Sequence, residues 1–82
     1  MNEIKDTIDL MKSEDYKNRF LAEYHQLKIR TNKLATMVEK YEKNELNFDP
    51  ECSLTLLKSQ LAAMKVYLII MKERAEIEKI EI

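Results

Sequence analysis

The chain has 82 residues, of which 45% are hydrophobic and 35% charged, and its net charge is −1. This length allows one small domain, and the composition is neither that of a disordered chain nor that of a membrane protein. The absence of glycine excludes a P-loop and a dinucleotide-binding glycine motif, and a single cysteine excludes an internal disulfide and a cysteine-based zinc site.

Residues 1–12 are predicted to form a short N-terminal helix. Ile4, Ile8 and Met11 fall at i, i+4 and i+7, which is the spacing of one face of an amphipathic helix. A helix of this length is marginal in water, so we expect it to dock on the rest of the chain. A second interpretation is that residues 1–10 are an appendage. The segment lacks the basic and apolar regions of a signal peptide.

Residues 13–82 are predicted to form a long helical hairpin. Ser13, followed by two acidic residues, is typical of a helix N-cap. From there to about Asn44, apolar and aromatic residues recur with the alternating spacing of a heptad seam, which favours packing against another helix. The members of this first seam are Phe20, Tyr24, Leu27, Thr31, Leu34, Val38 and Tyr41.

The connector after Asn44 contains turn-forming residues without glycine. Two residues compete as the N-cap of the next helix: Asp49, which is followed by Pro50, and Ser53. Cys52 lies near this helix start, where we expect a small buried side chain.

The last predicted helix runs from about Glu51 to Ile77 or beyond and carries a second heptad seam. Its members are Leu54, Leu57, Leu61, Met64, Leu68, Met71 and Ala75. We expect the two seams to pack antiparallel. The predicted fold is therefore all-α, with a short N-terminal helix and a long antiparallel helical hairpin.

Around residues 66–71 the last helix is apolar on every side, which is typical of a helix that is buried on every side. Exposing Val66, Ile69 and Ile70 would forgo about 1.5–3 kcal/mol each. We therefore expect a homo-oligomeric helical bundle with Val66, Tyr67, Ile69 and Ile70 at the interface. The alternative is a monomer whose N-terminal helix shields this patch. The apolar run is far shorter than the roughly 20 residues that span a bilayer, so no membrane partner is expected.

The sequence offers no catalytic device. His25 is the only histidine, and neither heptad seam contains an acidic residue. A catalytic triad, a paired-carboxylate site and a di-metal carboxylate site are therefore not supported. We expect no enzymatic activity, no metal and no cofactor.

A basic stretch runs from Lys17 to Lys40, with six lysines and arginines against two acids. Tyrosine rings can stack on bases, and lysine and arginine can pair with phosphate, so this stretch is a candidate anion site. The other interpretation is an ordinary solvated helix face. Because the whole chain is close to neutral and lacks a recognisable helix-turn-helix, nucleic-acid binding is not expected.

Several segments resemble a crAss-like-phage-related family of small helical accessory proteins of phages and prophages. They are MKSEDYK from Met11, EYHQLKIR from Glu23, FDPEC from Phe48 and RAEIE from Arg74, and the resemblance covers Met11 to Ile82. One departure is Lys79, which stands where the family pattern has a glycine before isoleucine.

This resemblance implies a phage protein that disarms host immunity in the host bacterial cytoplasm. The layout is also similar to that of phage sponges that sequester cyclic-nucleotide signals in a pocket between protomers. The residues implied to bind such a ligand are Tyr16, Lys17, Tyr24, Lys28 and Arg30. The alternative is a protein-binding inhibitor of a defence effector, for example an anti-CRISPR inhibitor of a Cas nuclease. The expected partners are a second copy and either a cyclic nucleotide or a host defence protein.

Overall fold

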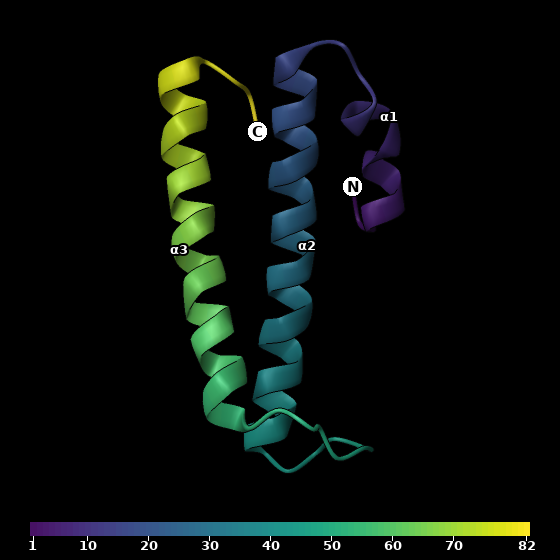
Figure 1. Cartoon of the computed structure of the whole chain (residues 1–82), viewed down its shortest axis with the longest axis vertical. Helices are drawn as coiled ribbons and strands as arrows, with labels where there is room; N and C mark the ends of the chain where they lie inside the picture. The colour runs from purple at the N-terminus through teal and green to yellow at the C-terminus, as the bar shows by residue number, and fades with distance from the viewer.

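The computed structural model describes residues 1–82 and contains helices without strands, which confirms the all-α prediction. The elements in chain order are the 3-10 helix η1 (Ile4–Thr7), α1 (Ile8–Met11), α2 (Tyr16–Glu42) and α3 (Leu54–Glu78). The two long helices lie side by side along a molecule 43 Å long, and η1 and α1 lie on the other side of α2 (Figure 1).

The start of α2 differs from the prediction by two residues. Its N-cap is Asp15, whose carboxylate accepts a hydrogen bond from the backbone N–H of Lys17 at 2.9 Å. Ser13 lies two residues earlier, and its hydroxyl accepts hydrogen bonds from the Asp15 backbone N–H and from the Asn18 side-chain amide. Ser13 therefore fixes the turn that leads into the helix rather than capping it.

The N-cap of α3 is Ser53, one of the two predicted candidates. The Ser53 hydroxyl accepts a hydrogen bond from the backbone N–H of Leu56 at 3.1 Å. Pro50 and Cys52 precede the helix, and the Cys52 side chain is exposed. The expectation of a buried cysteine was therefore wrong, because Cys52 belongs to the connector and not to the first helical turn.

Both heptad seams lie in the interior between α2 and α3. Every member of each seam is buried or half-buried, as the spacing predicted. At one end of the pair, the Tyr16 hydroxyl lies 2.8 Å from the Glu78 carboxylate, and at the other a Lys58–Glu42 ion pair measures 2.7 Å. The start of α2 thus meets the end of α3. Met71 is fully buried between them, as expected of a methionine that fills a core.

The chain closes over this core after α3. Lys79 adopts a left-handed conformation with φ of 59°, and the Ile80 backbone N–H donates to the Ala75 carbonyl at 2.8 Å. This pattern is a Schellman-type helix end, in which the reversed chain returns an apolar side chain to the helix. Ile80 is accordingly buried in the cluster that contains Phe20 and Met71.

The N-terminal segment docks on the molecule, as predicted, but with a different face. Ile8 and Met11 are exposed, whereas Thr7 is fully buried. The reason is that η1 is a 3-10 helix, which repeats every three residues, so Ile4 and Thr7 share its inner side. The Thr7 hydroxyl accepts a hydrogen bond from the Gln26 side chain of α2 at 2.8 Å.

The position of this segment excludes one interpretation of the apolar patch on α3. Both η1 and α1 contact α2, and neither contacts α3. The N-terminal helix therefore does not shield Val66, Ile69 or Ile70, each of which is about half exposed.

Candidate functional site

The structure does not bring the five predicted ligand residues together. Tyr16 lies at the end of the helix pair, where its hydroxyl donates to Glu78 and accepts from Arg74, both at 2.8 Å. The Lys17 ammonium lies at this same end, 3.5 Å from the Lys79 carbonyl oxygen. Tyr24 is only 4% exposed, so its ring is part of the core and offers no face to a base.

Lys28 and Arg30 lie farther along α2, beside three hollows that meet at Lys33. Lys28 and Arg30 line different hollows, and we call the three neighbouring hollows together the α2 notch. The first hollow is lined by Met1, Asn2, His25, Lys28, Ile29 and Asn32; the second by Ile4, Arg30, Leu34, Gln60 and Met64; and the third by Thr36, Lys40, Glu45, Leu46, Asn47 and Phe48. Lys33 is common to all three, and Met37 lines the second and the third. The individual hollows measure about 380, 440 and 440 Å³.

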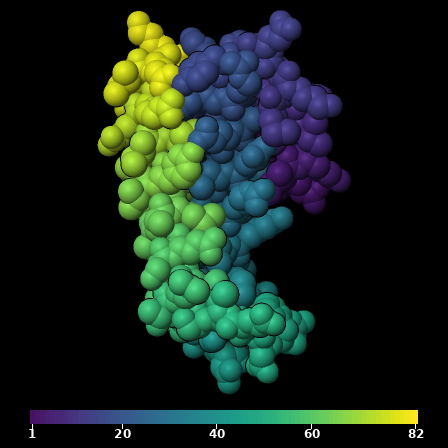
Figure 2. All heavy atoms as spheres, viewed as in Figure 1, coloured from purple at the N-terminus to yellow at the C-terminus, as the bar shows by residue number.

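The α2 notch exists because the N-terminal segment covers only part of α2. Ala22, Gln26, Ile29 and Lys33 follow the spacing of one helix side, and the first three are buried or half-buried whereas Lys33 is exposed. Beyond Ile29 this side is open, and the connector forms the opposite wall. The space-filling view shows the molecule hollowed here, between its N-terminal residues and the connector (Figure 2).

The charge that lines the notch is predominantly positive. Four exposed cations, Lys28, Arg30, Lys33 and Lys40, line it and form no ion pair, whereas the only acidic lining residue is Glu45. A concave surface lined by one sign of charge concentrates the field and attracts ligands of the opposite sign. The notch is therefore suited to an anion.

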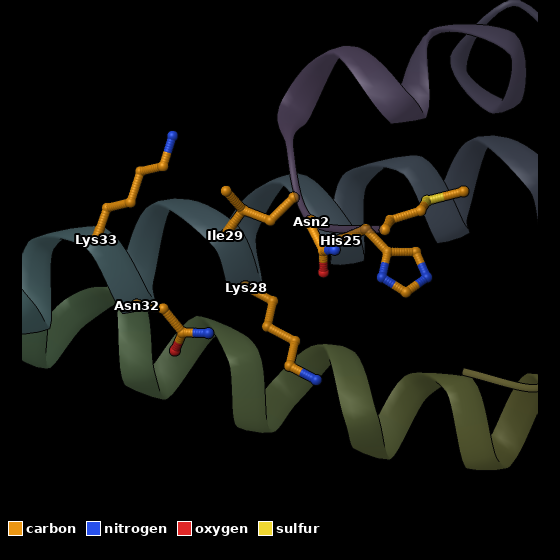
Figure 3. Close-up of a pocket in the computed structure, with 7 residues that line it drawn as sticks. Asn2, His25, Lys28, Ile29, Asn32 and Lys33 are labelled. Carbon is orange, nitrogen blue, oxygen red and sulfur yellow. The ribbon is translucent and has the colours of Figure 1, made fainter.

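His25 adds a titratable group at the end of the notch that is lined by the N-terminal residues. Partial burial and then neighbouring positive charge, including that of Lys28, lower the pKa of the His25 imidazole below its ordinary value. Figure 3 shows His25 beside Asn2, with Lys28 and Asn32 directed to the same side of α2 and Lys33 extending away from them. The imidazole and the two amides can donate or accept hydrogen bonds next to the lysines.

Of the five predicted ligand residues, Lys28 and Arg30 line the notch, whereas His25, Lys33 and Lys40 line it without having been predicted. Lys33 and Lys40 belong to the basic stretch, so the sequence predicts their charge. It does not predict that they line a common hollow, because the walls of the notch come from the N-terminal residues and the connector, which no local pattern places beside α2. No group of three or more histidine, cysteine, aspartate or glutamate side chains is placed to hold a metal ion.

A second exposed feature is the side of α3 that faces away from α2. All four predicted interface residues, Val66, Tyr67, Ile69 and Ile70, lie at the surface. Tyr67 is partly engaged, since its hydroxyl donates a hydrogen bond to the Glu23 carboxylate of α2. By length and composition α3 could cross a membrane, with a mean hydropathy of 1.4 over an 18-residue window of which only 17% is buried.

A family model described as Sequestin matches residues 14–77. The matched range includes α2, the connector and nearly all of α3, and therefore the floor of the α2 notch and the exposed side of α3. No curated protein and no solved structure matches the chain.

Proposed function

Since the chain belongs to the Sequestin family, whose model matches most of its length, we propose that it is a non-enzymatic binding protein that sequesters a cyclic-nucleotide immune signal. In this proposal it is a phage accessory protein that counters host defence in the bacterial cytoplasm. The family name itself suggests sequestration, and the resemblance to phage accessory proteins supports the setting.

The observation that carries this proposal is the set of unpaired cations in the α2 notch. A cyclic nucleotide presents phosphates, which pair with lysine and arginine, and bases, which stack on aromatic rings. Lys33 and Lys40 line the hollow beside the connector together with Phe48, whose side chain is half exposed. Phe48 thus takes the stacking role that the sequence had assigned to Tyr16 and Tyr24.

Calorimetric titration with cyclic di- and trinucleotides tests this proposal. The wild-type protein is expected to bind at least one of them, and the double variant Lys33→Gln, Lys40→Gln is expected to lose at least about tenfold in affinity, since each lost phosphate contact weakens binding. Lys17→Gln is the matched control, because Lys17 lies on α2 outside the notch. Absence of binding at high micromolar ligand would contradict the proposal.

We further propose that the protein is a homo-oligomer. The support is the exposed apolar side of α3, which no other part of the chain covers. Native mass spectrometry of the purified protein measures the number of copies and detects a co-purified nucleotide in the same experiment. A single copy at every concentration would contradict this part of the proposal.

A second candidate function is inhibition of a host defence effector through a protein interface, for example as an anti-CRISPR inhibitor of a Cas nuclease. The same apolar side of α3 favours it, because large exposed apolar patches mark interaction sites. Capture of a defence effector by the wild-type protein but not by Val66→Glu, without any nucleotide binding, would favour this function over sequestration.

A further inference from the structure

The exposed side of α3 carries a partly apolar stripe with heptad spacing, in which Ala63, Val66, Ile70 and Ile77 are apolar. Ser59, Ala63, Val66, Ile70, Glu73 and Ile77 recur with spacings of four and three, and all six are exposed. We call these six residues the outer seam. They lie about half a helical turn away from the seam that packs on α2. Because heptad seams arise where one helix packs along another, the outer seam is suited to a further helix.

We propose that the outer seam binds the outer seam of a second copy of this chain, with the two α3 helices antiparallel. This inference rests on the homo-oligomer part of the proposed function and defines its interface. The two-fold axis crosses α3 midway between Val66 and Ile70, so that Val66 of each copy packs against Ile70 of the other.

The sizes of the side chains favour this orientation. The N-terminal half of the outer seam is small, with Ser59 and Ala63, whereas the C-terminal half carries the large aliphatic residues Ile70 and Ile77. An antiparallel pair places each small half opposite a large half, so the two surfaces interdigitate. A parallel pair would set large residues against large ones and leave a gap between the small residues.

The distribution of charge favours the same orientation. From Leu54 to Lys72, α3 carries three lysines and no acid, whereas its last turns carry Glu73, Glu76 and Glu78. Lys58 and Glu78 already form ion pairs within the chain, but Lys65 and Glu73 form none. An antiparallel pair brings Lys65 of one copy near Glu73 of the other, whereas a parallel pair aligns like charges.

Glu73 also argues for a second copy rather than a bilayer as the occupant. It lies within the outer seam, between Ile70 and Ile77, where a membrane would enclose its carboxylate in hydrocarbon. An acidic residue within a membrane-spanning helix is costly without a partner. A second copy supplies such a partner in Lys65.

Disulfide cross-linking tests the orientation. In a Cys52→Ser background, chains carrying Val66→Cys are mixed with differently sized chains carrying Ile70→Cys and oxidised gently. The proposal expects the mixed Val66→Cys with Ile70→Cys dimer to dominate, because these positions face each other. Dominant cross-links between identical positions would overturn the antiparallel arrangement, and absence of cross-links would overturn the interface.

Charge reversal tests the ion pair by sedimentation. Lys65→Glu is expected to weaken the dimer at least about fivefold, and adding Glu73→Lys in the same chain is expected to restore it.

A charge placed in the apolar contact tests the interface itself. Ile70→Asp is expected to give a monomer with unchanged helix content by circular dichroism, whereas Ile8→Asp, on the exposed side of α1, leaves the dimer intact. An intact Ile70→Asp dimer, or flotation of the wild-type protein with anionic lipid vesicles in place of dimerisation, would overturn the inference.

Nucleotide binding to the Ile70→Asp monomer separates this inference from the proposed function. The α2 notch belongs to one chain, so the monomer is expected to bind nucleotide as the wild type does. A wild-type dimer that binds no nucleotide would support the interface and contradict the proposed ligand. A wild-type monomer that binds nucleotide would support the ligand and contradict the interface.

Discussion

Lys79 is the residue whose backbone departs furthest from what its side chain favours. Its φ of 59° lies in the left-handed region, which costs a non-glycine residue about 1–2 kcal/mol. The conformation persists because it returns Ile80 to the core and lets the Ile80 backbone N–H bond to Ala75. The glycine that the family pattern led us to expect at this position is the residue that adopts such a conformation without strain.

Lys79→Gly is therefore expected to stabilise the protein. Relief of strain, less the added entropy of the unfolded chain, raises the free energy of unfolding by about 0.5–1 kcal/mol. Urea denaturation monitored by circular dichroism measures the change. Asn44→Gly is the control, because Asn44 has a φ of 58° but asparagine tolerates this region, so a smaller gain is expected. A loss of stability in Lys79→Gly would contradict the explanation.

Glu78 is expected to make the stability of the protein depend on pH in the acid range. The hydrogen bond from the Tyr16 hydroxyl, and then that from Arg74, lower the pKa of the Glu78 carboxyl below its ordinary value in the folded state. A group whose folded pKa is lowered contributes stability above its unfolded pKa and loses it as the pH falls through the folded pKa. The same contacts raise the pKa of the Tyr16 phenol and of Arg74.

Glu78→Gln is accordingly expected to flatten the acid side of the stability profile. Between about pH 6 and about pH 3 the wild type loses more unfolding free energy than the variant, because the variant has no carboxylate to protonate. Chemical denaturation across this range measures both curves. Glu76→Gln is the matched control, since Glu76 is exposed on the same turn and forms no ion pair. Parallel curves for wild type and Glu78→Gln would contradict the assignment.

The packing of the two long helices could be predicted from the sequence, whereas the packing of the N-terminal segment could not. The two long helices were predictable because a heptad spacing records a regular contact, and each member of both seams is buried or half-buried. The N-terminal segment was placed on the wrong face because the spacing of Ile4, Ile8 and Met11 presupposes an α-helix, whereas residues 4–7 form a 3-10 helix. The notch was missed because its walls are distant in sequence from α2.

Thr7→Val is expected to loosen the N-terminal segment without affecting the long helices. Thr7 is fully buried and provides an oxygen acceptor for the Gln26 amide, so the change leaves that amide only the weak thioether acceptor of Met11, at a cost of about 1–2 kcal/mol. Hydrogen exchange is expected to quicken in residues 4–11 and to stay unchanged in the interior of α2. Thr36→Val is the control, since Thr36 is an exposed threonine of α2. Equal protection of residues 4–11 in wild type and Thr7→Val would contradict this role.

At the scale of the whole molecule, the two candidate surfaces share no residue, although the notch reaches α3 at Gln60 and Met64. Most of the notch lies on the part of α2 that the N-terminal segment leaves open, and the outer seam lies on α3 about half a helical turn from the residues that pack on α2. In an antiparallel dimer built on the outer seam, each notch is therefore formed by one chain alone. This arrangement differs from a sponge whose pocket forms between protomers, which the layout of the sequence had suggested.

Because no residue belongs to both surfaces, ligand binding and dimerisation are expected to be independent. Coupling between two sites requires a ligand that binds the two states with different affinity, and here each notch is complete within one chain. Saturating cyclic nucleotide is thus expected to change the dimer dissociation constant by less than about twofold, as measured by sedimentation with and without ligand. A ligand that drives dimerisation tenfold or more would show instead that a second chain completes the site.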